Sequence, residues 1–291
     1  MIIIARSYGQ LGNRLFLYAH MIAAARTHGV SLANPCFADY AHLFPSTADD
    51  LWCRYPRVAP TDASPSLLRR RALAKSIYVS ARCLDAIGFH RGPLATLRLR
   101  GDENCDLASD EFADLAKRSR HLLALGWLFR SETLLAQHAD AVREHFQISP
   151  RHNQNVREAI STLRQRADFV VGVHIRHGDY ATFLDGKYYY TSWQYAAAMR
   201  RIAEQLPGRR VAFLVCSNSS LNRHDFGDLD VQFGPGHIIE DMYCFAQTDL
   251  LIGPPSTYTG WASFFGKVPL VAMHQADTPI DLSQPIAAAA A

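Results

Sequence analysis

Several features of well-known protein classes are missing from this sequence. No apolar run is long enough for a membrane-spanning helix, and the run at residues 1–5 is too short for a signal peptide. The six cysteines are scattered without a C-x-x-C pair, which argues against a zinc or redox motif and favours reduced thiols. No zinc-finger spacing or aromatic ribonucleoprotein motif is present, so no nucleic-acid partner is expected. We therefore expect a cytoplasmic protein.

The composition is that of an ordinary globular chain. Its 291 residues are 48% hydrophobic and 20% charged, which excludes disordered, collagenous and disulfide-scaffold proteins. The length favours about two domains. The best linker is the segment 149–153, so we expect an N-terminal domain over residues 1–150 and a C-terminal domain over 151–291.

The positive charge is concentrated in one region. Residues 54–100 hold ten Arg or Lys and two Asp, a net charge of +8, although the whole chain carries only +3. Leu73, Ile77 and Leu84 are interleaved with these cations at roughly helical spacing. Two interpretations stay open. The region is either a basic amphipathic surface for an anionic membrane or a phosphate-bearing acceptor, or a solvated helix face without a partner.

Strands and helices alternate regularly in the second half of the chain. Continuous Val, Ile and Leu strands between amphipathic helices predict a parallel sheet covered on both faces. The expected strands are 169–175, 211–215, a short one near 231, 250–252 and 269–273, and the expected helices are 154–166, 192–205 and 240–248. The first half predicts one strand, 2–5, followed by a glycine loop and helices at 15–27, 66–87 and 132–145.

Polar loops follow three of the expected strands of the second half, at residues 176–180, 216–219 and 253–259. The carboxyl ends of parallel strands meet at one edge of a sheet, and ligands of open α/β sheets bind there. We therefore expect these three loops to line one ligand site.

The glycine loop contains Gly9, Gly12 and Asn13. It is neither a P-loop nor a G-x-G-x-x-G motif. Its backbone N–H groups and the following helix N-terminus would suit an anion, but a tight turn that needs glycine for its backbone freedom explains the pattern equally simply.

The segment His174-Ile175-Arg176-His177-Gly178-Asp179-Tyr180 is more informative. Alternate residues of a strand share a face, so His174 and Arg176 point the same way. The planar guanidinium of an arginine at a strand end suits a phosphate. Asp179 either pairs with Arg176 or caps the following turn, and a purely structural Arg–Asp pair is the alternative.

Further polar residues are candidates for binding a diphosphate or a metal. Ser256 and Thr257 either cap a helix or bind a diphosphate with their hydroxyls and free N–H groups. Glu240 and Asp241 open another helix, and either caps it or binds a ribose or a base edge. The D-x-D tripeptide at 228–230 is used by some sugar transferases to hold a divalent ion, but it is common by chance.

These segments together resemble the family 11 glycosyltransferases, the α-1,2-fucosyltransferases. The opening G-Q-L-G-N-R-L-F-L-Y-A resembles their G-G-L-G-N-Q-M-F-Q-Y-A, and residues 126–132 resemble G-Y-F-Q-S-E. H-I-R-H-G-D-Y is similar to H-I-R-R-G-D-Y, the most specific motif, and residues 240–264 resemble E-D-M-Y-L-M-S … I-A-N-S-S-F-S-W-W-G-A-W. The match runs in the right order over most of the chain.

The resemblance implies a GT-B-like fold of two Rossmann-like α/β domains with parallel sheets and the active site in the cleft between them. It implies transfer of L-fucose from GDP-β-L-fucose to an acceptor sugar with inversion, without an essential metal or other cofactor. Glycan or surface-polysaccharide synthesis, with a glycan or glycolipid acceptor on the N-terminal side, is the role implied. Such an enzyme would be cytoplasmic or peripheral at the inner face of the membrane.

Site residues carry over by motif. Arg176 would hold the β-phosphate and stabilise the charge that grows on the leaving group, and His174 would line the same pocket. Asp179, His20, Glu132 or late proton loss to water are the options for the general base. The other expected donor-binding residues are Gly12 and Asn13 near the diphosphate and fucose, Ser217, Asp241 for guanine, and Ser256, Thr257 and Tyr258 at the phosphates.

Three positions depart from the family pattern. His177 replaces a second arginine, Asn218 replaces an aspartate, and Gly260 replaces a tryptophan. These departures leave two alternatives open, namely a transferase for another GDP-sugar and a non-catalytic protein that binds a GDP-sugar or glycan on the same fold.

Overall fold

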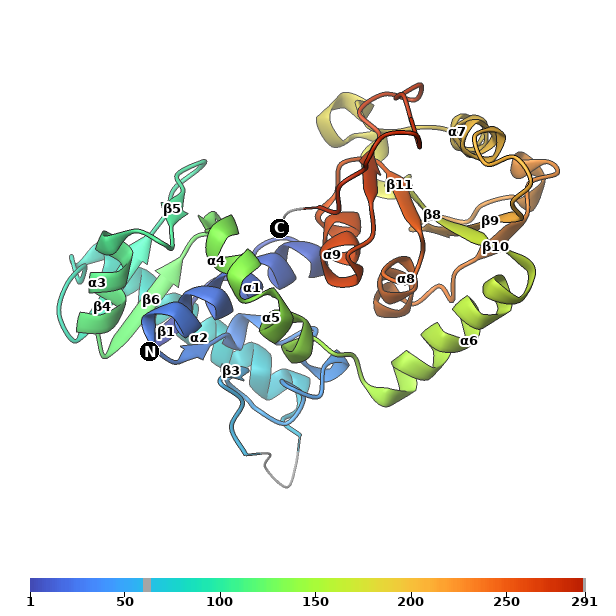
Figure 1. Cartoon of the computed structure of the whole chain (residues 1–291). Coiled ribbons are helices and arrows are strands. Elements are labelled where there is room, and N and C mark those ends of the chain that lie inside the picture. Colours follow the sequence, from blue (N-terminus) through green and yellow to red (C-terminus); the bar gives the residue numbers. More distant parts are fainter. Residues whose placement is uncertain (60–63, 290–291) are drawn as a thin grey trace. The chain divides into compact units, whose positions relative to one another are not determined.

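The computed structural model describes residues 1–59 and 64–289 (Figure 1). The chain divides into two compact units, with the boundary between Ser149 and Pro150. Both units are of the α/β type. Within the described residues, no helix combines the length and apolar character needed to cross a bilayer.

The N-terminal unit is built on a five-stranded sheet with the order β3-β2-β1-β6-β4. Neighbouring strands are parallel except β3, which runs antiparallel to β2 at the edge. The chain between β2 and β3 forms only two short 3-10 turns, and an antiparallel return needs no crossover helix. The strands are β1 (Ile2–Ile4), β2 (Leu32–Ala33), β3 (Arg54–Tyr55), β4 (Leu94–Arg98) and β6 (His121–Leu125).

Helix α1 (Leu11–His28) is the most deeply buried helix of this unit. It begins four residues earlier than the sequence predicted, directly after the glycine loop, because Leu11 and Gly12 are themselves buried in the core. It ends at Gly29, whose left-handed backbone (φ 67°) terminates the helix without a side-chain penalty.

Other elements complete the N-terminal unit (Figure 1). The helix predicted over 132–145 is two helices, because the backbone of His138 leaves the helical conformation (φ −112°, ψ 16°). The strands β2 to β7 and helix α3 were not predicted. The remaining elements are α2 (Leu67–Ala86), α3 (Asp110–Arg118), α4 (Glu132–Gln137), α5 (Ala139–His145), the paired strands β5 (Cys105–Asp106) and β7 (Phe129–Arg130), and the 3-10 turns Pro35–Phe37 and Ala41–Leu43.

The C-terminal unit is a five-stranded, wholly parallel sheet with the order β10-β9-β8-β11-β12. Val171, Val173 and Ile175 of β8 pack in a core with α7, while α6, α8 and α9 contact one another in series (Figure 1). The strands are β8 (Phe169–Ile175), β9 (Val211–Ser217), β10 (Val231–Phe233), β11 (Leu250–Gly253) and β12 (Leu270–Ala272). The helices are α7 (Ser192–Glu204), α8 (Ile238–Phe245), α9 (Thr257–Gly266) and the 3-10 turns Gly178–Ala181, Phe183–Gly186 and Arg223–Phe226.

Helix α6 (Pro150–Arg166) begins inside the segment that the sequence marked as a linker. Residues 150–153 form its first turn, so the helix begins four residues earlier than predicted, while the boundary between the two units falls within the predicted linker segment. Proline suits the first helical position, because it lacks only an N–H group that has no helical partner there and its φ is already helical.

Candidate functional site

The three polar loops of the C-terminal unit meet at the carboxyl edge of its sheet. The Tyr180 hydroxyl, after β8, donates to the carbonyl of Pro255, after β11, at 3.0 Å. The backbone N–H of His177 donates to Oδ1 of Asn218, after β9, at 3.0 Å, and that of Gly178 donates to the Ser219 hydroxyl at 3.2 Å. The sequence prediction that these loops lie together is therefore confirmed by direct hydrogen bonds.

Arg176 lies at the end of β8 and makes a bidentate ion pair with Asp179. Its Nε and Nη2 donate to the two carboxylate oxygens at 3.1 and 2.9 Å, and its guanidinium stands 4.8 Å from the ring centre of Tyr180. These hydrogen bonds hold the pKa of Asp179 below its usual value. The Arg176 side chain is 17% exposed, and its Nη1 has no hydrogen-bond partner within the described residues. One edge of the guanidinium is therefore available to an anion.

His174 lies two residues earlier on the same strand and is buried. Its ring lies 5.0 Å from the ring of Tyr258 and 6.0 Å from that of Phe245. Burial lowers its pKa to about 3, with a smaller contribution from the charge of Arg176. His174 is thus a neutral imidazole at physiological pH, and its Nδ1 atom is buried without a hydrogen-bond partner within residues 1–59 and 64–289.

The two departures from the family motif in these loops have structural explanations. The Nε2 atom of His177 lies 2.8 Å from the carbonyl oxygen of Tyr190, which requires an Nε2–H donor, and the ring packs on Tyr189. Its Nε2 atom is therefore engaged within the loop. Asn218 accepts from His177 with Oδ1 and faces Oδ1 of Asp179 with its NH2 group at 3.4 Å. A carboxylate at position 218 would face that of Asp179.

The Asn218→Asp variant is expected to lower the free energy of unfolding by up to about 1 kcal/mol at low salt, because two exposed carboxylates then face each other. Added salt and protonation below about pH 4 should both remove the loss. Urea unfolding of the Asn218→Asp variant, with Asn222→Asp as the control, measures this loss of unfolding free energy. Asn222 caps the 3-10 turn Arg223–Phe226 by accepting from His224, a role that aspartate also fills, so the control should keep full stability. Equal stability of the two variants would contradict the Asn218–Asp179 contact.

The bend at 253–259 uses its hydroxyls for its own structure. Ser256 is the N-cap of α9 and accepts from the N–H of Tyr258, as the capping alternative predicted. The Thr259 and Tyr258 hydroxyls donate to backbone carbonyls of Ser256 and Ile238. The hydroxyl of Thr257 has no hydrogen-bond partner within the described chain, and this half-buried residue opens the helix. Thr257 thus keeps the polar group that a ligand would use.

Asp241 lies on α8 with its carboxylate buried. Its Oδ1 accepts from the N–H of Gly236 at 2.9 Å, and burial raises its pKa to about 6. A Cβ on Gly234 would stand 2.6 Å from the same oxygen and 2.5 Å from the sulfur of Cys216, so the loop approaches α8 this closely only with glycine there. Ser217, next to Cys216, accepts from the N–H of Ser219. Asp241 therefore shapes the loop at 234–236.

Two of the acidic residues considered for ligand binding, Asp230 and Glu240, have partners within the protein. Asp230 of the D-x-D tripeptide forms an ion pair with Arg166 at 3.0 Å. Glu240 accepts from Asn155 and contacts Nδ1 of His152, both at 2.7 Å. His152, His237 and Glu240 form the one group of three potential metal ligands within residues 1–59 and 64–289, and it does not include the D-x-D tripeptide. The N-cap of α8 is His237, so neither Glu240 nor Asp241 fills that role.

In the N-terminal unit, the glycine loop leaves the N-terminus of α1 open. Gln10 at the N-cap makes no side-chain hydrogen bond, and the first turn has no acidic residue. The backbone of Gly9 is left-handed (φ 58°), and a Cβ there would collide with the side chain of Asn13. Arg14 binds the carbonyl of Gly9 and the carboxylate of Asp39. An uncapped helix N-terminus next to a half-buried asparagine is a favourable anion position.

Two expected candidates for the general base lie in this unit. His20 is buried in α1, and burial lowers its pKa to about 3, so it is a weak proton acceptor. Glu132 lies in the first turn of α4.

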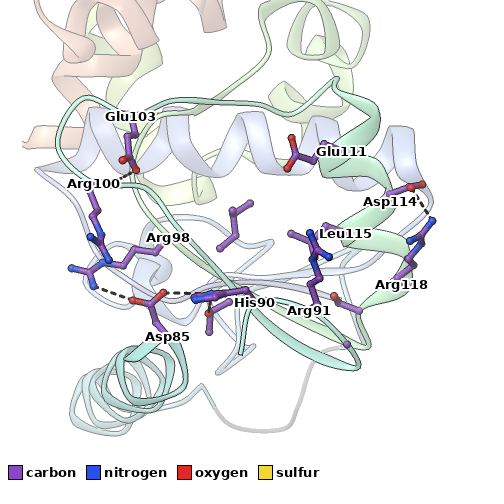
Figure 2. A pocket seen from close by; sticks show the side chains of 14 residues that line it. Asp85, His90, Arg91, Arg98, Arg100, Glu103, Glu111, Asp114, Leu115 and Arg118 are labelled. Atoms are coloured by element: carbon purple, nitrogen blue, oxygen red, sulfur yellow. Dashed lines mark hydrogen bonds and ion pairs between the residues drawn. The ribbon is translucent and has the colours of Figure 1, made fainter. Parts of the chain in front are cut away.

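A charged cleft of about 890 Å³ also lies in the N-terminal unit, along β4 and α3 (Figure 2). Two of its arginines are paired, Arg98 with Asp85 and Arg118 with Asp114, both at 3.0 Å. The side chains of Arg91 and Arg100 have no ion-pair partner among the described residues. Sequence reasoning missed this cleft, because it had not predicted β4 and α3. The high arginine content of residues 54–100 was the available signal.

The chain resembles solved structures in its fold, but it does not match known families or curated proteins in its sequence. No protein-family model and no curated protein sequence matches the chain significantly. A FUT1 variant of Arabidopsis thaliana in complex with GDP is 14% identical, with a TM-score of 0.58 over 92% of this chain and 69% of that one. POFUT1 in complex with GDP is 12% identical, with a TM-score of 0.57 over 93% and 98%. NodZ from Bradyrhizobium is 15% identical, with a TM-score of 0.54 over 96% of each chain.

The chain has the GT-B-like fold of these structures. The coverage includes both units, since more than nine-tenths of this chain aligns with each of these structures. The wholly parallel C-terminal sheet, with polar loops at its carboxyl edge, is the half that the sequence predicted for nucleotide-sugar binding. Identities of 12–15% place the chain in this fold, and family 11 itself is not matched by a family model.

Proposed function

We propose that this protein is an inverting glycosyltransferase that transfers L-fucose from GDP-β-L-fucose to a hydroxyl group of an acceptor sugar. The fold shared with FUT1, POFUT1 and NodZ supports the reaction class, and those proteins were crystallised with GDP or GDP-fucose. The four sequence motifs favour an α-1,2 linkage and a role in glycan or surface-polysaccharide synthesis. The observation that carries the proposal is the partly open guanidinium of Arg176 at the carboxyl edge of the C-terminal sheet.

In the proposed reaction, the acceptor hydroxyl oxygen attacks C1 of fucose while the bond from C1 to the β-phosphate oxygen breaks. GDP leaves with the bonding electron pair, so negative charge grows on its β-phosphate. Arg176 stabilises that charge with a planar pair of donors, and a preorganised donor of this kind is usually a large catalytic contribution. Gly12, Asn13 and Thr257 supply further contacts to the fucose and phosphates in this proposal.

Asp179 positions Arg176 in this scheme. The ion pair already orients the guanidinium along two hydrogen bonds. The same ion pair lowers the pKa of Asp179, which makes its carboxylate a weak general base. The hydroxyl proton then leaves through Asp179, Glu132 or late transfer to water, and these options stay open.

No metal or other cofactor is required in the proposal. Arg176 supplies positive charge to the leaving diphosphate in this proposal, and the open N-terminus of α1 is a second candidate for that role. Asp241 remains the proposed residue for guanine, although its carboxylate already accepts from Gly236.

We assign the acceptor to the charged cleft of the N-terminal unit. Its unpaired arginines, Arg91 and Arg100, offer hydrogen-bond donors to sugar hydroxyls and to anionic substituents (Figure 2). Replacing either arginine with alanine is expected to raise the KM for the acceptor by about tenfold, because each removes charge-assisted hydrogen bonds. Neither change should alter the affinity for GDP. Lys117→Ala, at an exposed position of α3 outside the cleft lining, is the matched control. An acceptor KM that stays at the wild-type value would remove the acceptor from this cleft.

Calorimetry with a panel of nucleotide sugars tests the donor, followed by a transfer assay with the donor that binds best. We expect GDP-fucose to bind more tightly than GDP-mannose and UDP-sugars, and to be turned over in the presence of an acceptor glycan. Tightest binding of another GDP-sugar would identify a transferase of different specificity. Binding of GDP-fucose without hydrolysis or transfer would identify a non-catalytic binding protein, the second alternative left open by His177, Asn218 and Gly260.

A further inference from the structure

Helix α2 lies on the surface of the N-terminal unit with most of its length exposed. Only Arg70 and Ala81 of its twenty residues are buried. The Arg70 guanidinium donates to backbone carbonyls of Asp50 and Thr47, while Ile77 and Leu84 pack at the edge of a small core. These contacts fix one face of α2 and leave the opposite face uncovered within the described part of the chain.

The uncovered face carries large apolar side chains. Leu68 is 79% exposed and Val79 is 50% exposed. Two further apolar side chains are exposed in the turn after the helix, Ile87 at 69% and Phe89 at 42%. Ala72 and Lys75 fill the helical positions between Leu68 and Val79, so the apolar residues share one side of the helix. Single exposed apolar residues are common, but an aligned set of this kind marks an interaction surface.

Basic residues lie within and beside this apolar stripe. Arg69 and Lys75 are exposed, and neither side chain has an ion-pair or hydrogen-bond partner within the described residues. Arg71 and Arg82 lie on the adjoining side. The one acidic residue of α2, Asp85, is turned inward with its side chain 7% exposed and is paired with Arg98. Asp39 pairs with Arg71 on the adjoining side at 2.8 Å, and the uncovered face itself has cations and apolar groups without a carboxylate of α2.

We propose that this face of α2, together with the exposed turn at Ile87 and Phe89, docks on an anionic lipid bilayer, with the helix lying in the plane of the surface. Lys and Arg are attracted to lipid phosphates, while the leucine, valine, isoleucine and phenylalanine side chains enter the boundary of the acyl chains. The charge complementarity favours an anionic partner, and the apolar stripe favours a membrane over a nucleic acid, which would use the cations alone. For residues 54–100 the sequence analysis left three interpretations open: a membrane, a phosphate-bearing acceptor and a face without a partner. For α2, the exposed apolar side chains favour the membrane.

Sedimentation with vesicles tests the docking independently of catalysis. We expect the protein to sediment with vesicles of phosphatidylcholine and phosphatidylglycerol, and to stay in solution with phosphatidylcholine alone. Arg69→Gln with Lys75→Gln should weaken binding by about twenty-five-fold, since each cation contributes about fivefold. Leu68→Ser with Val79→Ser should also weaken it, by removing the apolar insertion. Lys117→Gln with Arg120→Gln removes two exposed cations from elsewhere in the same unit and should leave binding unchanged.

A dye at Cys83 reports contact with the bilayer directly. Cys83 is the exposed cysteine, on the outward side of α2, whereas four cysteines are buried and burial raises the pKa of the Cys105 thiol to about 11. A polarity-sensitive maleimide dye there should shift to the blue with anionic vesicles and not with neutral ones. Absence of sedimentation with anionic vesicles would overturn the proposal. So would binding that the Leu68 and Val79 substitutions leave intact and that an RNA competes away, because that result describes a general polyanion site.

Discussion

The Arg176→Ala variant is expected to lose at least about 3 kcal/mol of transition-state stabilisation, a fall of roughly a hundredfold or more in fucosyl transfer. The guanidinium lies at the end of a buried strand and is held by two hydrogen bonds to Asp179. It therefore does not have to be reorganised when charge develops on GDP. Because that charge grows as the glycosidic bond breaks, the loss should fall mainly on kcat, with a smaller change in the affinity for the donor.

Two further variants separate this role from a structural one. Arg176→Lys retains the charge without the planar fork, and it should recover only part of the rate. Arg166→Ala breaks an ion pair to Asp230 of similar length in the same unit, so it controls for the loss of an arginine–aspartate pair. We expect Arg166→Ala to keep nearly full transfer activity. Transfer by the Arg176→Ala protein within tenfold of wild type, with unchanged thermal unfolding, would end the assignment of Arg176.

The strands that could be predicted from the sequence are those buried on both faces. Residues 169–175 and 211–215 are continuous apolar runs, and they form β8 and β9 at the expected places. The strand β4, Leu-Ala-Thr-Leu-Arg, is a partly buried edge strand without such a run, so its pattern carried little signal. Helix α3 has a clear polar and apolar side, but only Phe112 and Ala116 are buried.

The sequence predicted the part of the site that follows from the strand topology, namely that the three polar loops lie together. The rule that parallel strands end at one edge was enough to bring the three polar loops together. The partners of individual side chains depend on tertiary contacts that no spacing reveals. His177 turns to the carbonyl of Tyr190, and Asn218 stands beside Asp179. The cleft of the N-terminal unit could not be predicted without the two elements that form it.

Acidification from pH 7 to pH 5 is expected to lower the free energy of unfolding by about 4 to 5 kcal/mol. Burial lowers the pKa of three deeply buried histidines the most, to about 3 for His20 and His174 and to about 4 for His145. It also lowers the pKa of His138 and His237, which adds to the loss in the same direction. Unfolded histidine has a pKa of about 6.5, so between pH 6.5 and 4 the unfolded chain binds more protons than the folded one. Each of the three deeply buried histidines thus costs about 2 kcal/mol of stability at pH 5.

One carboxyl acts in the opposite direction within this pH range. Burial raises the pKa of Asp241 to about 6, so the folded chain takes up a proton there before the unfolded chain does, and acidification to pH 5 returns about 1 kcal/mol. The carboxyls with lowered pKa, among them Asp50 and Asp179, lose their contribution only below about pH 4. The histidines therefore dominate the balance between pH 7 and pH 5.

Urea unfolding at both pH values measures this difference, and substitutions assign it to residues. His174→Gln is expected to reduce the difference by about 2 kcal/mol even where it lowers stability at both pH values, because glutamine does not titrate. His224→Gln, at an exposed histidine of the same unit, should leave the difference unchanged. A chain equally stable at pH 5 and pH 7 would show that these imidazoles are hydrated in the folded state. That result would also contradict the assignment of His174 as a buried, neutral imidazole beside Arg176.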